Sequence, residues 1–121
     1  MYKASLLKLR VSPYKANQVV SMVRGMNALK AMKQLDFCRK RIAQDIRKLI
    51  RSATANAENN YGADLDLLRV AQIWVGRATP MKRTRWHAKG RGSVIERPFT
   101  NVYVVLDTQT EAVANTKKGA K

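Results

Sequence analysis

The segment MKRTRWHAKGRG, from Met81 to Gly92, constrains the fold more than any other part of this chain. It holds five Lys or Arg residues and no acidic residue, and like charges at this density cannot be buried in a protein core. The runs LLRVAQIWVGRA before it and NVYVVLDT after it are typical of strands. A structureless loop of about twenty residues between them would be unusual. We therefore expect the two strands to continue outward as a β-hairpin arm, at about residues 79–98.

The turn of this arm is expected at KGRG, Lys89 to Gly92, because two glycines would supply the positive φ values that a tight turn needs. At about 3.3 Å per residue, a strand from Thr79 to Gly90 would reach on the order of 35 Å. A two-stranded ribbon without a core is marginal in water. The arm should therefore become ordered only when it is lodged in a partner.

The charge of the whole chain indicates that this partner is a polyanion. There are 24 Lys and Arg residues against 8 Asp and Glu, a net charge of +16, and an anionic partner relieves self-repulsion on this scale. Arginine forks match phosphate oxygens, aromatic side chains stack on unpaired bases, and glycine permits close backbone approach. This combination favours RNA. The predicted RNA-contacting residues in and beside the arm are Arg77, Lys82, Arg83, Arg85, Trp86, His87, Lys89, Gly90, Arg91 and Arg97.

Other classes of function fit less well, and one stays open. An architectural DNA-binding protein also uses basic two-stranded arms, so it remains the alternative. A membrane partner fits poorly, because the chain has neither a transmembrane run nor a segregated amphipathic face. His87 lies among cations with no carboxylate beside it, and Cys38 is the only cysteine. We therefore expect no enzymatic activity, no metal site and no cofactor, and a soluble protein of a reducing compartment.

The remaining sequence predicts strands and helices around one core. The first strand, YKASLLKLRV, should direct Leu7, Leu9 and Val11 to one face. A helix should follow between Ser12 as N-cap and Gly25 just past its end, and a second should begin after Asn27. The longest helix is expected at about residues 39–60, ended by Gly62, with one buried face made of Ile42, Ile46, Leu49, Ala53 and Ala57.

The domain organisation is expected to be simple. Both long strands are apolar enough to be central in a small sheet, and no linker divides the chain. We predict a single RNA-binding domain over residues 1–108. The tail QTEAVANTKKGAK, residues 109–121, is small, polar and basic, and we expect it to be disordered.

Five segments in this order resemble the bacterial family of large ribosomal subunit protein twenty-two. They are SPYKANQVVSMVRG, KRIAQDIRKLIRSATANAENN, LRVAQIWVGRA, MKRTRWHAKGRG and ERPFTNVYVV, and the resemblance covers about residues 4–108. It implies an α+β fold, with three helices packed on a small antiparallel β-sheet and a long protruding β-hairpin.

The same resemblance implies a function. The family is a structural part of the large ribosomal subunit in the cytoplasm, where it binds ribosomal RNA, adjoins other ribosomal proteins and aids assembly. Its hairpin lines the nascent-peptide exit tunnel, so the nascent chain is a further implied partner. Trp86 and His87 lie where the family varies more. The positions that match its motifs are Lys15, Arg24, Lys82, Arg83, Lys89, Gly90 and Arg91.

Overall fold

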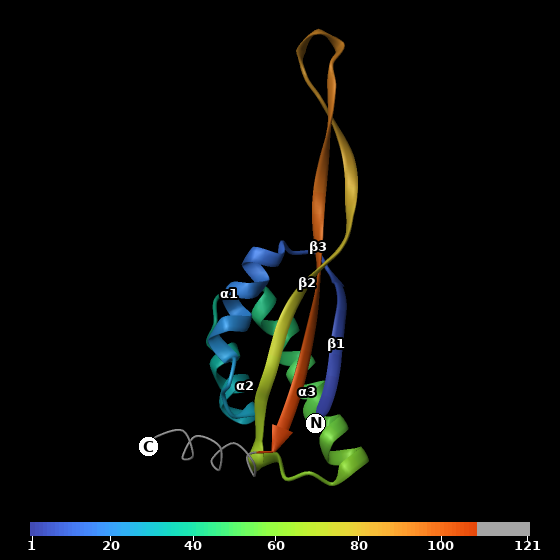
Figure 1. The fold of residues 1–121 in the computed structure, drawn as a ribbon. Helices are drawn as coiled ribbons and strands as arrows, with labels where there is room; N and C mark the ends of the chain where they lie inside the picture. Colours follow the sequence, from blue (N-terminus) through green and yellow to red (C-terminus); the bar gives the residue numbers. More distant parts are fainter. Residues whose placement is uncertain (109–121) are drawn as a thin grey trace, which may run out of the picture.

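The computed structural model describes residues 1–108, and the prediction for the tail at 109–121 lies outside this range. Three helices cover one face of a three-stranded antiparallel sheet, in which the strand order is β1-β3-β2. This confirms the predicted α+β class. The hairpin of β2 and β3 projects well beyond the helices (Figure 1). The elements are β1 (Tyr2–Leu9), α1 (Pro13–Val23), α2 (Ala28–Asp36), α3 (Ile42–Tyr61), β2 (Leu68–Trp86) and β3 (Gly92–Thr108), with short 3-10 turns at Leu65–Leu67 and Ala88–Gly90.

The helix ends follow the local sequence signals. The Ser12 hydroxyl accepts a hydrogen bond from the Lys15 backbone N–H at the start of α1. The Asn27 side chain accepts one from the Leu29 N–H at the start of α2, with an N–O distance of 2.9 Å. Gly62 ends α3 with φ of 59°, a left-handed conformation that glycine adopts without a steric penalty. These positions confirm the predicted caps.

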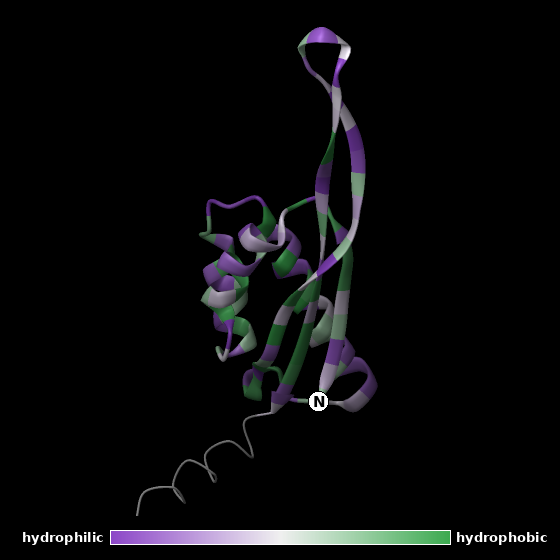
Figure 2. Ribbon diagram, turned by 45° about the horizontal axis from the view of Figure 1, so that its top comes forward, coloured by the Kyte–Doolittle hydropathy of each residue, from purple (hydrophilic) through white to green (hydrophobic). Residues whose placement is uncertain are grey.

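The core lies between α3 and the inner face of the sheet. The five residues predicted for the buried face of α3 are all buried. They meet alternate residues of β3, where Val102, Val104 and Leu106 point inward. Figure 2 shows these strands mostly in hydrophobic colours in the body, whereas hydrophilic colours predominate in the hairpin beyond it. Apolar side chains recur along the strands within the body and form the core there. They do not recur along the hairpin, which therefore has no core.

Leu7 of β1 was predicted to lie on the same face as Leu9 and Val11, and this is wrong. Its side chain is 56% exposed. Ala4 and Leu6 point inward instead. The register with β3 shifts between Leu6 and Leu9, and Lys8 takes a positive φ of 58° within this bulge. A bulge adds one residue to a strand and so reverses the alternation of its side chains. Leu9 consequently packs against the core as predicted, although Leu7 does not.

The sheet has one long central strand rather than two. β3 pairs with both neighbours, whereas β2 lies at an edge, so the expectation that both are central is wrong for β2. The connection between α1 and α2 covers this edge, because the Gly25 N–H donates to the Val70 carbonyl and the Val70 N–H donates to the Met26 carbonyl. The Arg24 guanidinium donates to the Ile73 carbonyl at 3.2 Å. Such covering prevents another strand from adding to this part of the β2 edge.

The turn of the hairpin differs from the predicted one at a single position. Gly90 has a positive φ of 68°, but the second left-handed residue is Lys89, with φ of 60°, and not Gly92. Gly92 is already part of β3 and pairs with Trp86. A Cβ atom at Gly92 would lie 3.1 Å from the indole atom Cε3 of Trp86. The small size of Gly92 therefore serves side-chain packing, and the turn uses Lys89 instead.

Candidate nucleic-acid interface

The two faces of the arm carry different chemistry. Residues directly opposite each other in an antiparallel ladder share a face. Arg83 opposes Ile95, and Arg85 opposes Ser93, while Arg97 opposes Met81. These six residues define the arginine face, which carries three positive charges and no negative one. It can therefore follow a chain of phosphates without repulsion.

The opposite face is close to neutral. Lys82 opposes Glu96, and Thr84 opposes Val94, while Trp86 opposes Gly92. These six residues define the tryptophan face, in which the single cation and the single anion balance. The Trp86 side chain is 75% exposed, with the edge of its ring against Gly92. A face of this kind gains little from phosphate, but it offers an aromatic surface to an unpaired base or to a peptide.

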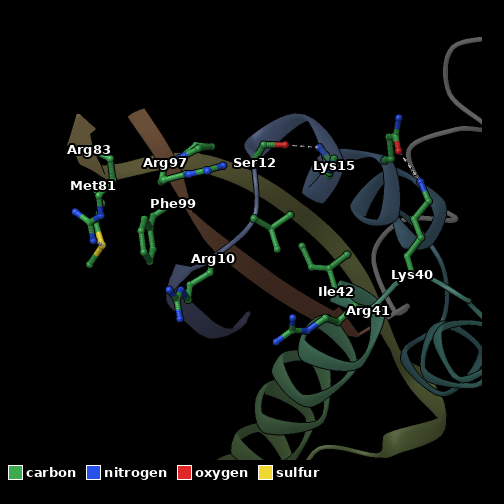
Figure 3. A pocket seen from close by; sticks show the side chains of 13 residues that line it. Arg10, Ser12, Lys15, Lys40, Arg41, Ile42, Met81, Arg83, Arg97 and Phe99 are labelled. Atoms are coloured by element: carbon green, nitrogen blue, oxygen red, sulfur yellow. Dashed lines mark hydrogen bonds between the residues drawn. The ribbon is translucent and has the colours of Figure 1, made fainter. Parts of the chain in front are cut away.

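A hollow of about 960 Å³ lies at the base of the arm, where the arginine face meets the helical layer (Figure 3). Its cations come from α1, from both strands of the arm, and from the segments that follow β1 and precede α3. None of its lining residues is acidic. We call it the basal hollow. Its cationic residues are Arg10, Lys15, Lys40, Arg41, Arg83 and Arg97, and its other lining residues are Val11, Ser12, Gln18, Ile42, Met81, Pro98 and Phe99.

These six cations carry uncompensated charge within the described part of the chain. The two ion pairs found among residues 1–108 join the N-terminus to Asp107 and Arg47 to Asp36, so neither involves the basal hollow. Lys40 donates to the neutral Gln18 amide. Arg83 donates to its neighbouring Lys82 carbonyl at 2.9 Å. The positive charge is therefore available to an external anion.

Two helix N-termini add to this field. α1 begins at Pro13 and α3 at Ile42, and residues of both first turns or their flanks line the basal hollow. The first turn of α3 has no side-chain cap, and the Ala43 and Gln44 N–H groups donate to the carbonyls of Lys40 and Arg41 instead. A helix N-terminus carries about half a positive charge. The helix dipoles therefore add positive potential at the basal hollow, and Asp45 in the first turn of α3 offsets part of it.

Four of the seven acidic residues in the described range lie at the other end of the molecule, while Asp36, Asp45 and Glu96 lie elsewhere. Glu58 lies near the end of α3, Asp64 and Asp66 adjoin the 3-10 turn before β2, and Asp107 is near the end of β3. In Figure 1 these element ends lie opposite the arm. The described chain is thus electrically polarised, with its arm and basal hollow at the positive end. Such polarity directs that end toward a polyanion during association.

The other predicted site residues are exposed but scattered. Arg77 lies on β2 opposite Thr100, and Lys89, Gly90 and Arg91 are at the tip. His87 is also at the tip, where its Nε2 lies 2.7 Å from the Ser93 hydroxyl oxygen. Arg24 was predicted only as an RNA contact, but its guanidinium also donates a hydrogen bond to β2. RNA contact by each of these residues stays a prediction.

Three cations of the basal hollow were missing from the sequence-based set. They are Arg10, Lys40 and Arg41. Arg10 follows β1, and the other two precede α3, so they are separated by about thirty residues in the chain. Each lies next to an end of a strand or helix that has a periodic apolar face, and this position is the only sequence signal that could have indicated it. Only the topology brings those ends together beside the arm.

No group of three or more His, Cys, Asp or Glu side chains that could hold a metal ion occurs within residues 1–108. In the same range, no helix combines the length and the apolar character required to cross a bilayer.

The fold and the charge distribution define a small basic α+β protein that presents a cationic hairpin. The family model for ribosomal protein L22p/L17e matches residues 4–107. The large ribosomal subunit protein uL22 of Phenylobacterium zucineum is 45% identical over 109 residues, which cover 90% of this chain and 86% of the relative. Its counterpart in Beijerinckia indica subsp. indica is 46% identical over 112 residues, covering 93% and 87%. The chain belongs to the L22p/L17e family of ribosomal proteins.

This membership confirms the family indicated by the sequence. A third relative, large ribosomal subunit protein uL22 of Methylorubrum populi, is 47% identical over 104 residues, covering 86% of this chain and 82% of the relative. The protein is thus a ribosomal protein and not an enzyme, as predicted.

Proposed function

We propose that this protein binds large-subunit ribosomal RNA through its arm and its basal hollow, as a structural constituent of the large subunit in the cytoplasmic ribosome. The observation that supports this most strongly is the separation of charge. Three arginines occupy one face of the arm, and the basal hollow beside that face is lined by six cations without an acid. A polyanion that touches the base of the arm would meet positive charge from both layers of the protein.

The shape of the arm supports an inserted position. All residues from Met81 to Val94 are exposed, so this part of the hairpin has no core within the described chain. RNA packed around it would supply the missing contacts, and neighbouring ribosomal proteins would adjoin the body. By joining RNA segments that lie at the arm and at the body, the protein would also aid assembly of the subunit.

A competition experiment separates RNA from duplex DNA. The full chain should prefer folded large-subunit ribosomal RNA over duplex DNA of equal phosphate number at matched salt, because the exposed aromatic ring of Trp86 favours unpaired bases. Filter binding with labelled RNA and unlabelled competitors measures this preference. Stronger competition by the duplex would favour an architectural DNA-binding protein instead.

We further propose that the tip of the arm lines the nascent-peptide exit tunnel, with the tryptophan face turned away from the densest phosphate. The near-neutral charge of that face supports this orientation, because it gains little from phosphate and presents an apolar ring. The nascent polypeptide would then pass beside Trp86 and the turn at Ala88–Gly90.

Photocrosslinking tests this placement. A photoreactive amino acid at Ala88, in the turn, should crosslink to a stalled nascent chain in translating ribosomes, whereas the same group at Leu67, beyond the other end of the sheet, should not. Gel analysis of a labelled nascent chain reads out the crosslink. Crosslinking of both positions, or of neither, would contradict a tunnel position for the tip.

A further inference from the structure

The basal hollow combines two surfaces that one kind of ligand would satisfy together. Six of its lining residues are cations, which we call the rim, and five are apolar, which we call the floor: Val11, Ile42, Met81, Pro98 and Phe99. Phe99 is half-buried, and Met81 is 45% exposed. A phosphate alone would satisfy the rim and leave the floor against water. A purely apolar ligand would cover the floor and leave six cations unpaired.

A regular RNA helix would also leave the floor uncovered. In an A-form duplex the bases are stacked inside, and side chains meet mainly phosphates and 2′-hydroxyl groups. An unpaired nucleotide differs, because its base can leave the stack and lie against an aromatic or aliphatic side chain while its phosphates stay outside. The volume of about 960 Å³ is large enough for such an inserted group.

The placement of the cations fits a strand that passes over the hollow. Figure 3 shows Arg83 and Arg97 on the arm, Arg10 below them, and Lys15 and Lys40 toward the helices. Phe99 lies between the arm cations and the body in the same view. Cations on several sides of one aromatic ring can hold the phosphates before and after a nucleotide whose base rests on that ring.

We propose that the basal hollow binds an unpaired nucleotide of the RNA, with its base on the Phe99 ring and its flanking phosphates on the surrounding cations. This inference rests on the proposed RNA-binding function and adds the kind of RNA feature that the base of the arm recognises. Phe99 acts as the stacking surface, and Met81 and Ile42 belong to the same apolar lining. The cations themselves select for phosphate and not for a particular base.

The test compares two probes on the full 121-residue chain. The first probe is hexa-adenylate RNA, and the second is an abasic ribose-phosphate strand of equal length. NMR of methyl-labelled protein follows the Met81 and Ile42 methyl groups, because a stacked adenine shifts nearby methyl resonances upfield by its ring current. We expect this shift with hexa-adenylate and not with the abasic strand. Equal affinity for both probes, without the upfield shift, would overturn the proposal.

A matched pair of substitutions isolates the ring. Phe99→Leu removes the aromatic surface but retains an apolar side chain, and Phe37→Leu makes the same change at an exposed site outside the hollow. Phe99→Leu should lower the affinity for hexa-adenylate by roughly 5- to 150-fold, the range found for stacking aromatics, and Phe37→Leu should leave it unchanged. Thermal denaturation of both variants verifies that they fold. Equal affinities of the two folded variants would overturn the role of Phe99.

The same proteins distinguish this inference from the broader function. If wild-type protein prefers duplex DNA over large-subunit RNA, the proposed function fails. If it prefers the RNA but Phe99→Leu and Phe37→Leu bind hexa-adenylate equally, only the unpaired-nucleotide site fails. A selective loss in Phe99→Leu together with the preference for RNA supports both.

Discussion

Replacing Arg83, Arg85 and Arg97 together with glutamate is expected to weaken binding of the full chain to large-subunit ribosomal RNA by roughly 100-fold or more near 0.15 M salt. The three guanidinium groups share the arginine face of the arm, so one RNA strand can contact all of them. Each lost phosphate contact removes the gain from counterion release. The slope of log affinity against log salt should fall by about three, and filter binding across a salt series measures both quantities.

The control for this prediction carries the same change in net charge. Lys30, Lys33 and Arg51 are exposed on α2 and α3 and do not line the basal hollow. Their joint replacement by glutamate should reduce affinity much less, because only the long-range field changes. If both triple variants lose affinity equally, the total charge of the protein, rather than the arginine face, governs RNA binding.

The largest effect on stability is expected from Ile46→Ala. Ile46 is fully buried in the second turn of α3, and this helix packs against the sheet and both other helices. Truncation leaves a cavity that the surrounding side chains fill only in part, so the free energy of unfolding should fall by about 2–5 kcal/mol. For a domain of this size, the melting temperature should fall by roughly 10–30 °C. Circular dichroism during heating and urea titration measures both.

Met22→Ala supplies the matched control, because Met22 also lies in a helix but is 41% exposed. Its loss should lower the free energy of unfolding by less than about 1 kcal/mol. Ile46→Ala should leave the arginine face intact, so the RNA affinity of the folded fraction at low temperature should match the wild type. A similar loss of stability in both variants would show that α3 does not anchor the core.

Local signals in the sequence predicted the elements well. Ser12, Asn27 and Gly62 place helix ends because their side-chain acceptors or backbone freedom act within a few residues. The buried face of α3 follows from spacings of three and four residues. The arm was predicted from the high density of positive charge between two strand-like segments. Each of these inferences depends on physical effects that are local in the chain.

The departures have longer-range causes. The bulge at Lys8 reverses the alternation in β1, where the Lys8 N–H donates to the side chain of Asn101, on the neighbouring strand. β2 is an edge strand because β1 pairs with β3, and nothing local in either strand specifies that partner. At the tip, the chain tolerates a left-handed Lys89 while Gly92 makes room for Trp86.

Local signals in the sequence therefore determined the ends of the helices, the buried face of α3 and the existence of a cationic arm, because caps, periodicity and charge density are readable over short stretches. The α+β class and the family followed from the resemblance of five sequence segments to a known family. Only the tertiary structure decided which residues share a face of the arm and which form the basal hollow. Arg10, Lys40 and Phe99 are far apart in the chain and come together where β1, α3 and β3 meet. Strand register and helix packing make that juxtaposition, and both arise from pairings distant in sequence.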